Sequence, residues 1–433
     1  MAASGLSRGG RESDAKAGGV GEFELLAKVR SAVARLGLGS GVVVGIGDDC
    51  AVVRGPVVAR GASRGATPLQ VLTTDTMVEG VHFRAGWLTP RELGVRAFRA
   101  AVSDVAAMGG RARYVLLSLE LAVGAGGFDE KGALAVGAGG FDVKDALALV
   151  RGVAADARRA GATLVGGNVS GAVRTGVTVT VVGETRGKPL LRSGARAGDL
   201  VFVTGALGGA AAGVLALSKS EAAGVLGLSN ASDSRGGALT SAYRRPPLRL
   251  AFAAELGERG LAHAMVDVSD GLLQDLGHVA SASRVVLRID PGAVPVHRAA
   301  RLLELEPGAA RGFRARSAGL ENARRSDAGA AHELALRRHA GTAHELELRR
   351  NAASALELAL GGGEDYELAF TAAPASRPAI ERLAQKHRVP LAVIGSVVRG
   401  RPGVVGNDGR PFATTLAGFD HLRRPGRRET KRG

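Results

Sequence analysis

The chain has 433 residues, 45% of them hydrophobic and 3% aromatic, with a formal charge of +16, and this length predicts two domains of ordinary size. Nucleic acid is not an expected partner, because the positive charge is mostly Arg dispersed along the chain and few aromatic rings are present to stack on bases. The single Cys50 excludes an intramolecular disulfide and a cysteine-rich zinc site, and no apolar run reaches the roughly 18 residues of a membrane span, so we expect a cytoplasmic protein.

The first half of the chain alternates predicted helices and strands. Apolar residues at helical spacing predict a first helix over 22–37. After it we expect strands at 41–46, 71–74, 114–123, 163–165 and 177–182, and helices at 91–108 and 144–160. This alternation predicts an α/β domain over residues 21–186.

A second α/β domain is expected over residues 187–422. A polar turn at 192–199 precedes a strand at 200–204, and the glycines of 205–209 are expected to open a helix. Further strands are expected at 266–268, 285–289 and 368–371, with a helix at 272–282. The two halves therefore share the same alternation of elements, without a clear sequence repeat between them.

The tails and two local repeats lie outside this pattern. We expect residues 1–20 to be disordered and residues 423–433 to form a basic tail. LAVGAGGFDEKGA at 121–133 recurs with two changes at 134–146, and AHELALRRHAGT at 331–342 recurs imperfectly at 343–354. Both repeats are typical of duplications in surface connections, and the second predicts a low-complexity insert near 305–355.

Five short acidic motifs are the most informative feature of the sequence. Each lies where a strand-like apolar run or an apolar helix meets Gly, Ser or Thr; they are Gly47-Asp48-Asp49, Thr73-Thr74-Asp75, Ser103-Asp104, Asp267-Val268-Ser269-Asp270 and Gly363-Glu364-Asp365. Carboxylates are costly to bring together unless a cation neutralises them, and hard oxygen ligands suit Mg²⁺. The motifs therefore predict a Mg²⁺ site that holds a polyphosphate.

Each motif also has a plainer interpretation. An Asp-Asp pair alone is more often a solvated turn, and His82 is equally compatible with a core histidine and with a phosphate contact. Asp104 lies in a mainly apolar helix, where an unpartnered carboxylate would be costly, so a ligand role is favoured. Asp270 is compatible with a helix N-cap, and Asp275 is expected to be a solvated helix residue.

Taken together, the motifs resemble the thiamine-monophosphate kinase family, which belongs to the superfamily of aminoimidazole ribonucleotide synthetase. The resemblance runs from GEFELL at residue 21 to GFDHL at 418–422. Between them lie GIGDD, TTD-x-x-VEGVHF, SDVAAMG, RSGARAGD, DVSDGL and GGEDYEL. The resemblance implies two α/β halves, with the N-terminal halves of two subunits joining their strands into a dimeric β-barrel. It also implies ATP as co-substrate, several Mg²⁺ ions and thiamine monophosphate as the acceptor.

The resemblance also assigns site residues by position. The implied metal ligands are Asp49, Thr73, Thr74, Asp75, Asp104, Asn168, Asp267 and Asp270. The implied ATP contacts are Gly167, Asn168, Arg192 and Ser269, and the implied contacts to thiamine monophosphate are His82, Glu364 and Phe419. No catalytic residue separate from these is expected, because an acceptor phosphate is nucleophilic at neutral pH and catalysis by alignment and charge neutralisation suffices.

Two positions depart from the family pattern. Asn168 stands where Asp is common, which keeps an oxygen ligand but removes a negative charge, and Ala101 stands where Asn commonly precedes the Ser-Asp pair. These departures keep two alternatives open. One is another ATP-using enzyme of the superfamily, such as a purine-pathway synthetase, and the other is a nucleotide-binding homologue with weakened catalysis.

Overall fold

The computed structural model describes most of the chain between residues 41 and 412. The described residues are 27–31, 41–54, 69–122, 142–225, 234–304, 348 and 354–412. Residues 37–419 form one compact unit, and the other unit comprises 1–36 and 420–433, of which only a helical stretch at 27–31 is described. The predictions for both tails and for the greater part of both repeats lie outside the described residues.

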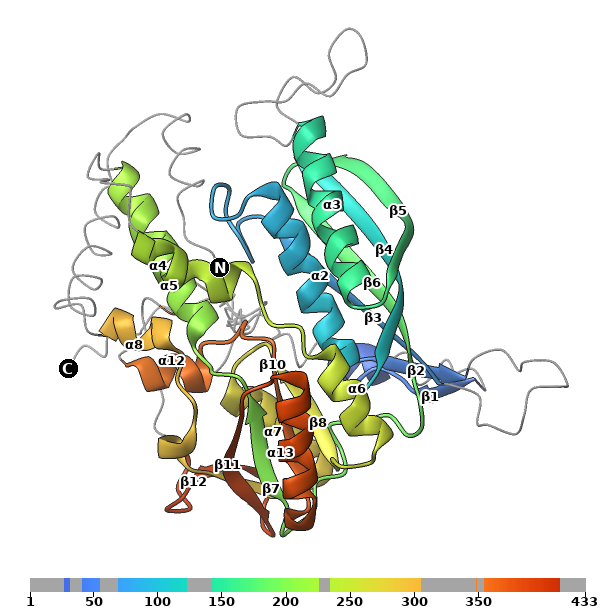
Figure 1. Ribbon diagram of the computed structural model, residues 1–433, viewed down its shortest axis with the longest axis vertical. Helices are drawn as coiled ribbons and strands as arrows, with labels where there is room; N and C mark the ends of the chain where they lie inside the picture. The colour runs from blue at the N-terminus through green and yellow to red at the C-terminus, as the bar shows by residue number, and fades with distance from the viewer. Residues whose placement is uncertain are drawn as a thin grey trace, which may run out of the picture. The chain divides into compact units, whose positions relative to one another are not determined.

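The first half of the main unit is built on a six-stranded sheet with the order β1-β2-β3-β6-β4-β5 (Figure 1). Its strands are β1 (Val42–Val44), β2 (Ala51–Arg54), β3 (Leu69–Val78), β4 (Arg111–Ala122), β5 (Thr163–Ala172) and β6 (Gly176–Thr185). All neighbours pair antiparallel except β4 and β5, which are parallel and are connected through helix α3 (Val143–Arg159). The long β5 is therefore an edge strand.

The second half contains a second six-stranded sheet with the order β12-β9-β11-β7-β10-β8. Its strands are β7 (Leu200–Thr204), β8 (Ala264–Val268), β9 (Val286–Ile289), β10 (Glu367–Ala372), β11 (Leu391–Val398) and β12 (Gly403–Gly406). The helices of this half are α4 (Gly209–Val225), α5 (Ser234–Arg244), α6 (Leu250–Glu258), α7 (Leu272–Ser283), α8 (Arg298–Glu304), α12 (Ala355–Gly361) and α13 (Arg377–His387), with 3₁₀ turns at Pro291–Ala293 and Pro374–Ser376.

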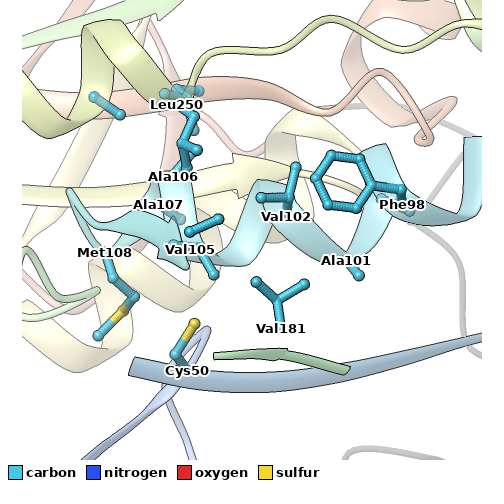
Figure 2. Packing of buried hydrophobic residues seen from close by; sticks show 14 of the residues in the cluster. Cys50, Phe98, Ala101, Val102, Val105, Ala106, Ala107, Met108, Val181 and Leu250 are labelled. Carbon is cyan, nitrogen blue, oxygen red and sulfur yellow. The ribbon is translucent and has the colours of Figure 1, made fainter. Parts of the chain in front are cut away.

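Helix α2 (Pro90–Ala107) connects the two halves. It begins where sequence predicts a start: Thr89 and Glu92 form a capping box and Pro90 occupies the first turn. The helix contacts β3 and β6 of the first sheet and β8 and β10 of the second. Its small apolar residues allow this close packing, and Figure 2 shows the α2 side chains between Val181 and Cys50 on one side and Leu250 of α6 on the other.

The α/β class in two halves is confirmed, and most predicted elements are present with shifted ends. Strand β3 extends to Val78 and β5 to Ala172, beyond the predicted 71–74 and 163–165. Both extensions contain Thr, Gly, Asn or Ser, whose low apolarity hid them from a search for hydrophobic runs. Among the described helices, none is both long and apolar enough to cross a membrane.

Candidate active site

Three carboxylates from distant parts of the chain form the centre of the site. Asp49 follows β1, Asp104 lies in the last turns of α2, and Asp267 lies near the end of β8. Each offers an oxygen, and these oxygens all lie within 4.8 Å of one another. The predicted convergence of the acidic motifs is therefore present for these three residues.

Strand β3 adds Thr73 to this cluster. The Thr73 hydroxyl donates a hydrogen bond of 2.5 Å to Asp104 Oδ2. Asp75 lies two residues further and so on the same face of the strand, and its Oδ1 accepts from the backbone amide of Thr76 at 2.7 Å. Thr73 and Asp75 thus line the same side of β3.

The side chain of Thr74 points away from the cluster. Successive side chains of a strand lie on opposite faces, and the Thr74 hydroxyl lies 3.0 Å from the hydroxyl of Thr180 on β6. The structure therefore does not bring the Thr74 hydroxyl to the carboxylates, although the sequence comparison grouped Thr73, Thr74 and Asp75 together.

Arg192 holds the turn that carries Asp48 and Asp49. Its guanidinium donates to Asp49 Oδ1 from Nε at 3.0 Å and from Nη2 at 2.5 Å, and its backbone amide donates to both oxygens of Asp48 at 3.3 Å. Burial, followed by the charge of Asp49, raises the pKa of Asp48 to about 6. Arg192, predicted as an ATP contact, thus lies beside the predicted metal ligands.

The cluster has the properties expected of a site for a divalent cation. Asp49 Oδ2 and Asp267 Oδ2 are buried oxygens without a hydrogen-bond partner among the described residues. Burial and then Asp49 raise the pKa of Asp267 to about 7, and burial and then Asp267 raise the pKa of Asp104 well above its usual range. A bound Mg²⁺ would give these oxygens the partner that they lack. Its positive charge would also favour the ionised carboxylates, which burial and mutual repulsion disfavour in its absence.

The corner between β8 and α7 is organised by Asp275, which we had expected to be a solvated helix residue. That expectation was wrong, since Asp275 is only 2% exposed. Its Oδ2 accepts from the backbone amides of Ser269, Asp270 and Gly271 at 3.1, 3.1 and 3.0 Å. A helix pattern cannot reveal this role, because the three amides come from a turn outside the helix.

Asp270 is not the side-chain cap of α7, since Gly271 occupies the N-cap position without a capping side chain. Asp270, Asp275 and His278 form a second group whose ligand atoms lie within 4.8 Å of one another. Burial and the charge of Arg192 lower the pKa of His278 to about 4, so this imidazole is neutral at physiological pH.

The segment 363–366 adopts an unusual backbone between α12 and β10. Gly363, Glu364 and Tyr366 have φ values of 68°, 60° and 51°, in the left-handed region that non-glycine residues rarely adopt. The Glu364 amide donates to the Ser269 carbonyl at 2.6 Å, which ties the segment to the β8–α7 corner. Two residues predicted from separate motifs, Ser269 and Glu364, are therefore in direct contact.

The two acidic residues of the GED motif have different surroundings. Asp365 accepts from the backbone amides of Gly208 at 2.7 Å and Ala210 at 3.2 Å at the start of α4, and burial raises its pKa to about 7. Glu364 instead pairs with Arg96 of α2 at 2.6 Å. Asp365 therefore stabilises the helix start, and Glu364 is the member of the pair that bonds to α2.

His82 lies in the turn after β3. Its Nδ1 accepts a hydrogen bond of 2.9 Å from the backbone amide of Val78. An accepting Nδ1 carries no proton, so the neutral ring has its N–H at Nε2. This arrangement fixes the orientation of the ring, as a ligand contact requires.

Gly167 and Asn168 lie on β5, away from the carboxylates. A Cβ at Gly167 would be 1.8 Å from the Leu117 carbonyl oxygen, so only glycine fits beside β4 at this position. Three strand spacings separate β5 from β3, which is roughly 14 Å. The single chain therefore does not bring Asn168 to the cluster, and its assignment stays a prediction; Phe419 lies outside the described residues.

Comparison with known proteins assigns both halves to one family. The AIR synthase related protein N-terminal domain matches residues 47–185, and the corresponding C-terminal domain matches residues 196–407. The chain is 30% identical over 407 residues to the thiamine-monophosphate kinase of Escherichia coli K12, which covers 94% of this chain and 99% of the relative. It is 33% identical over 262 residues to the Bacillus subtilis thiamine-monophosphate kinase, 60% of this chain and 70% of the relative.

Solved structures agree with this relationship. A structure described as AaThiL complexed with AMPPCP and TMP is similar with a TM-score of 0.64 and 25% identity, covering 93% of this chain and 97% of that one. Thiamine-monophosphate kinase from Stenotrophomonas maltophilia K279a gives a TM-score of 0.58 and 28% identity, with 90% and 98% covered. With both family domains in order and a relative matched over almost its full length, the chain belongs to the thiamine-monophosphate kinase family of AIR synthase-related proteins.

Proposed function

We propose that the chain transfers the γ-phosphoryl group of ATP to the phosphate of thiamine monophosphate, giving thiamine diphosphate. The observation that carries this proposal is the convergence of Asp49, Asp104 and Asp267, whose oxygens lie within 4.8 Å of one another, in a chain of this family. An acceptor phosphate needs no strong general base. Alignment of two anions is then the main task of the protein.

Mg²⁺ would be held by the carboxylates of this cluster together with Asp75, Asp270 and Thr73 of the neighbouring elements. When bound, the ions would neutralise the charge that repels donor from acceptor. Arg192 and Ser269, with Gly167 and Asn168, are the proposed ATP contacts. His82, Glu364 and Phe419 are the proposed contacts to thiamine monophosphate.

We also propose a homodimer formed through the first sheet. Apolar side chains on its edge strand and the strand beside it are unusually exposed: Tyr114 56%, Leu116 42%, Val165 56% and Val169 66%. An exposed apolar edge is an association surface. Sedimentation of wild type and Val169→Asp tests this: the wild type should sediment as a dimer and the variant as a monomer, and a monomeric wild type contradicts the proposal.

The decisive assay incubates the purified full chain with ATP, MgCl₂ and thiamine monophosphate and follows thiamine diphosphate by chromatography. We expect turnover that requires Mg²⁺, and a loss of about a hundredfold or more in kcat for Asp75→Asn and Asp270→Asn. Asp408→Asn is the matched control, because Asp408 lies in an exposed turn and its side chain caps a nearby amide.

The alternatives have distinct outcomes in the same assay. Saturable binding of ATP without formation of thiamine diphosphate indicates the weakened nucleotide-binding homologue that Asn168 and Ala101 suggest. Consumption of ATP only with a purine-pathway precursor indicates another enzyme of the superfamily. Wild-type turnover in both Asp75→Asn and Asp270→Asn would contradict the metal assignment.

A further inference from the structure

Arg96 of α2 is a buried cation at the junction of the two halves. Its side chain is 0% exposed, and Nη2 donates to Glu364 Oε1 at 2.6 Å. Nη1 donates to the backbone carbonyl of Tyr243, and the guanidinium carbon lies 3.9 Å from the centroid of the Tyr243 ring. Burying a guanidinium is costly, so a fixed set of partners around it indicates a specific role.

Tyr243 extends these contacts to the His82 turn. Its hydroxyl donates to the His82 carbonyl at 2.8 Å, and its ring meets Trp87 edge to face with centroids 5.9 Å apart. Arg96 is therefore bound directly to Glu364 from the second half and, through Tyr243, to His82 from the first. Two of the three proposed contacts to thiamine monophosphate, Glu364 directly and His82 through Tyr243, are thus connected to the Arg96 side chain.

The backbone at Glu364 needs such a partner. A φ of 60° is unfavourable for a non-glycine residue and persists only where surrounding contacts impose it. Two contacts contribute at this residue: the hydrogen bond from its backbone amide to the Ser269 carbonyl and the ion pair to Arg96. Loss of the ion pair would leave a carboxylate that is only 15% exposed without its counter-charge.

We propose that Arg96 is the positioning residue for the acceptor end of the site. It fixes the Glu364 carboxylate and the His82 turn relative to each other, and so sets the affinity for thiamine monophosphate. This inference rests on the proposed function and extends it to a residue that contacts neither the carboxylate cluster nor the proposed ATP contacts. Changing Arg96 should therefore affect the acceptor and leave ATP almost unaffected.

Helix α2 offers a closely matched control in Arg99. It is also buried, at 8% exposure, it pairs with the buried Asp156 of α3, and it donates to the backbone carbonyl of Pro246. Both arginines thus combine one carboxylate with one carbonyl from the same part of the chain. The partners of Arg99 include none of the proposed ligand contacts, so Arg99→Lys measures the purely structural effect of losing such a site.

The test compares Arg96→Lys with Arg99→Lys by steady-state kinetics. Lysine keeps the charge but cannot reproduce the fork of donors. We expect Arg96→Lys to raise KM for thiamine monophosphate by about tenfold while KM for ATP changes by less than about twofold, since misplacement of a binding group by about 1 Å has effects of this size or larger. Arg99→Lys should leave both KM values within about twofold.

A double-mutant cycle tests whether Arg96 acts through Glu364. If it does, Arg96→Lys added to Glu364→Gln should produce little further rise in KM for thiamine monophosphate. Equal KM shifts for the Arg96 and Arg99 variants, or fully additive effects in the cycle, would overturn the inference.

Trp87, the only tryptophan of the chain, provides a reading that does not depend on turnover. Its contact with Tyr243 predicts a change in emission when thiamine monophosphate is titrated onto the wild type and Arg99→Lys, and a titration shifted to about tenfold higher concentration for Arg96→Lys. If Arg96→Lys does not fold, Tyr243→Phe removes only the hydroxyl bond to His82 and should shift the same titration in the same direction. An unshifted Tyr243→Phe titration would then overturn the inference.

The failure of this inference differs from failure of the proposed function. A wild type that forms no thiamine diphosphate and gives no emission change with thiamine monophosphate overturns both. A wild type that turns over normally, with Arg96→Lys indistinguishable from Arg99→Lys, overturns only the role of Arg96.

Discussion

Arg192 donates both of its hydrogen bonds with Asp49 to one oxygen, Oδ1, while Oδ2 of Asp49 is buried without a protein partner among the described residues. The pair joins the GDD turn to the polar turn before β7, 143 residues later. Oδ1 of Asp49 thus stabilises the contact between the two turns, and Oδ2 is the oxygen that fits a cation.

Breaking this ion pair should destabilise the metal-free protein. Arg192→Met leaves the Asp49 side chain, which is 0% exposed, without its counter-charge, and we expect the free energy of unfolding in EDTA to fall by about 3–5 kcal/mol. Urea unfolding measures this, and the double variant Asp49→Asn/Arg192→Met should recover part of the loss. The control is Arg259→Met: this guanidinium is 51% exposed, and its partner Glu255 keeps contacts with Lys386 and His387, so the loss should be about 0–1 kcal/mol. Equal losses for both single variants contradict the interpretation.

The stability of the metal-free protein should respond to pH through Asp267. Its pKa is about 7 in the folded chain and 3.8 for an unperturbed Asp, so between about pH 4 and pH 7 the folded state binds more protons than the unfolded state. Stability contributed by this group therefore falls as pH rises through that window.

The measurement is the difference in free energy of unfolding between wild type and Asp267→Asn in EDTA, because the subtraction removes groups with opposite trends such as His278. As pH rises from about 4 to 7, the free energy of unfolding of the wild type should fall relative to that of the variant. Mg²⁺ should abolish this relative loss, because it binds to the wild-type cluster. If the free energy of unfolding of the wild type minus that of the variant stays constant or rises with pH, Asp267 does not hold a proton in the folded state as described.

Gly167 and Gly166 are neighbours in the chain, but substitution by Ala should change the free energy of unfolding differently at the two positions. A Cβ at Gly167 would lie 1.8 Å from a backbone oxygen, whereas a Cβ at Gly166 has no neighbour closer than 3.6 Å. We expect Gly167→Ala to lower the free energy of unfolding by about 1–3 kcal/mol and Gly166→Ala to leave it unchanged or raise it by up to about 1 kcal/mol. Urea unfolding of the two variants side by side decides between them.

The role of Asn168 is tested by placing there the carboxylate that the resemblance to the family implies. If Asn168 binds Mg²⁺, as the resemblance to the family implies, Asn168→Asp should lower the Mg²⁺ concentration for half-maximal turnover by a few-fold, since an added charge strengthens binding of a hard cation. Ser170→Asp is the control, because Ser170 lies two residues further on the same exposed strand. Identical Mg²⁺ curves for wild type and Asn168→Asp would remove Asn168 from the ligand set.

Sequence reasoning found the residues whose type conflicts with their surroundings. Asp104 was recognised because a carboxylate in an apolar helix needs a partner, and the structure provides Thr73. Alternation along β3 was also visible in the sequence, and it would have separated the Thr74 hydroxyl from Thr73 and Asp75. Selecting ligand residues from a motif on a strand therefore also requires the two-residue alternation of side chains between the faces of the sheet.

The residues that sequence reasoning missed depend on contacts between distant segments. Asp275 follows a helical pattern, and only the folded corner turns three amides toward it. Arg96 carried a signal of the same kind as Asp104, a charge among apolar helix residues, but nothing in the sequence identifies Tyr243 and Glu364 as its partners. Strand β11, an apolar run at Leu391–Val398, was accessible to pattern reasoning and was overlooked.

Helix α2 carries Arg96 near one end of the site and Asp104 near the other, eight residues apart, which is about 12 Å along the axis. An α-helix is stiff over two turns, so a translation of α2 as a rigid body moves both side chains by the same vector. The separation between the acceptor end and the cation end is consequently a property of one helix and is insensitive to small shifts between the two sheets. Substitutions that slide α2 in its packing should therefore change the affinities for both reactants together, while leaving the distance between their binding groups intact.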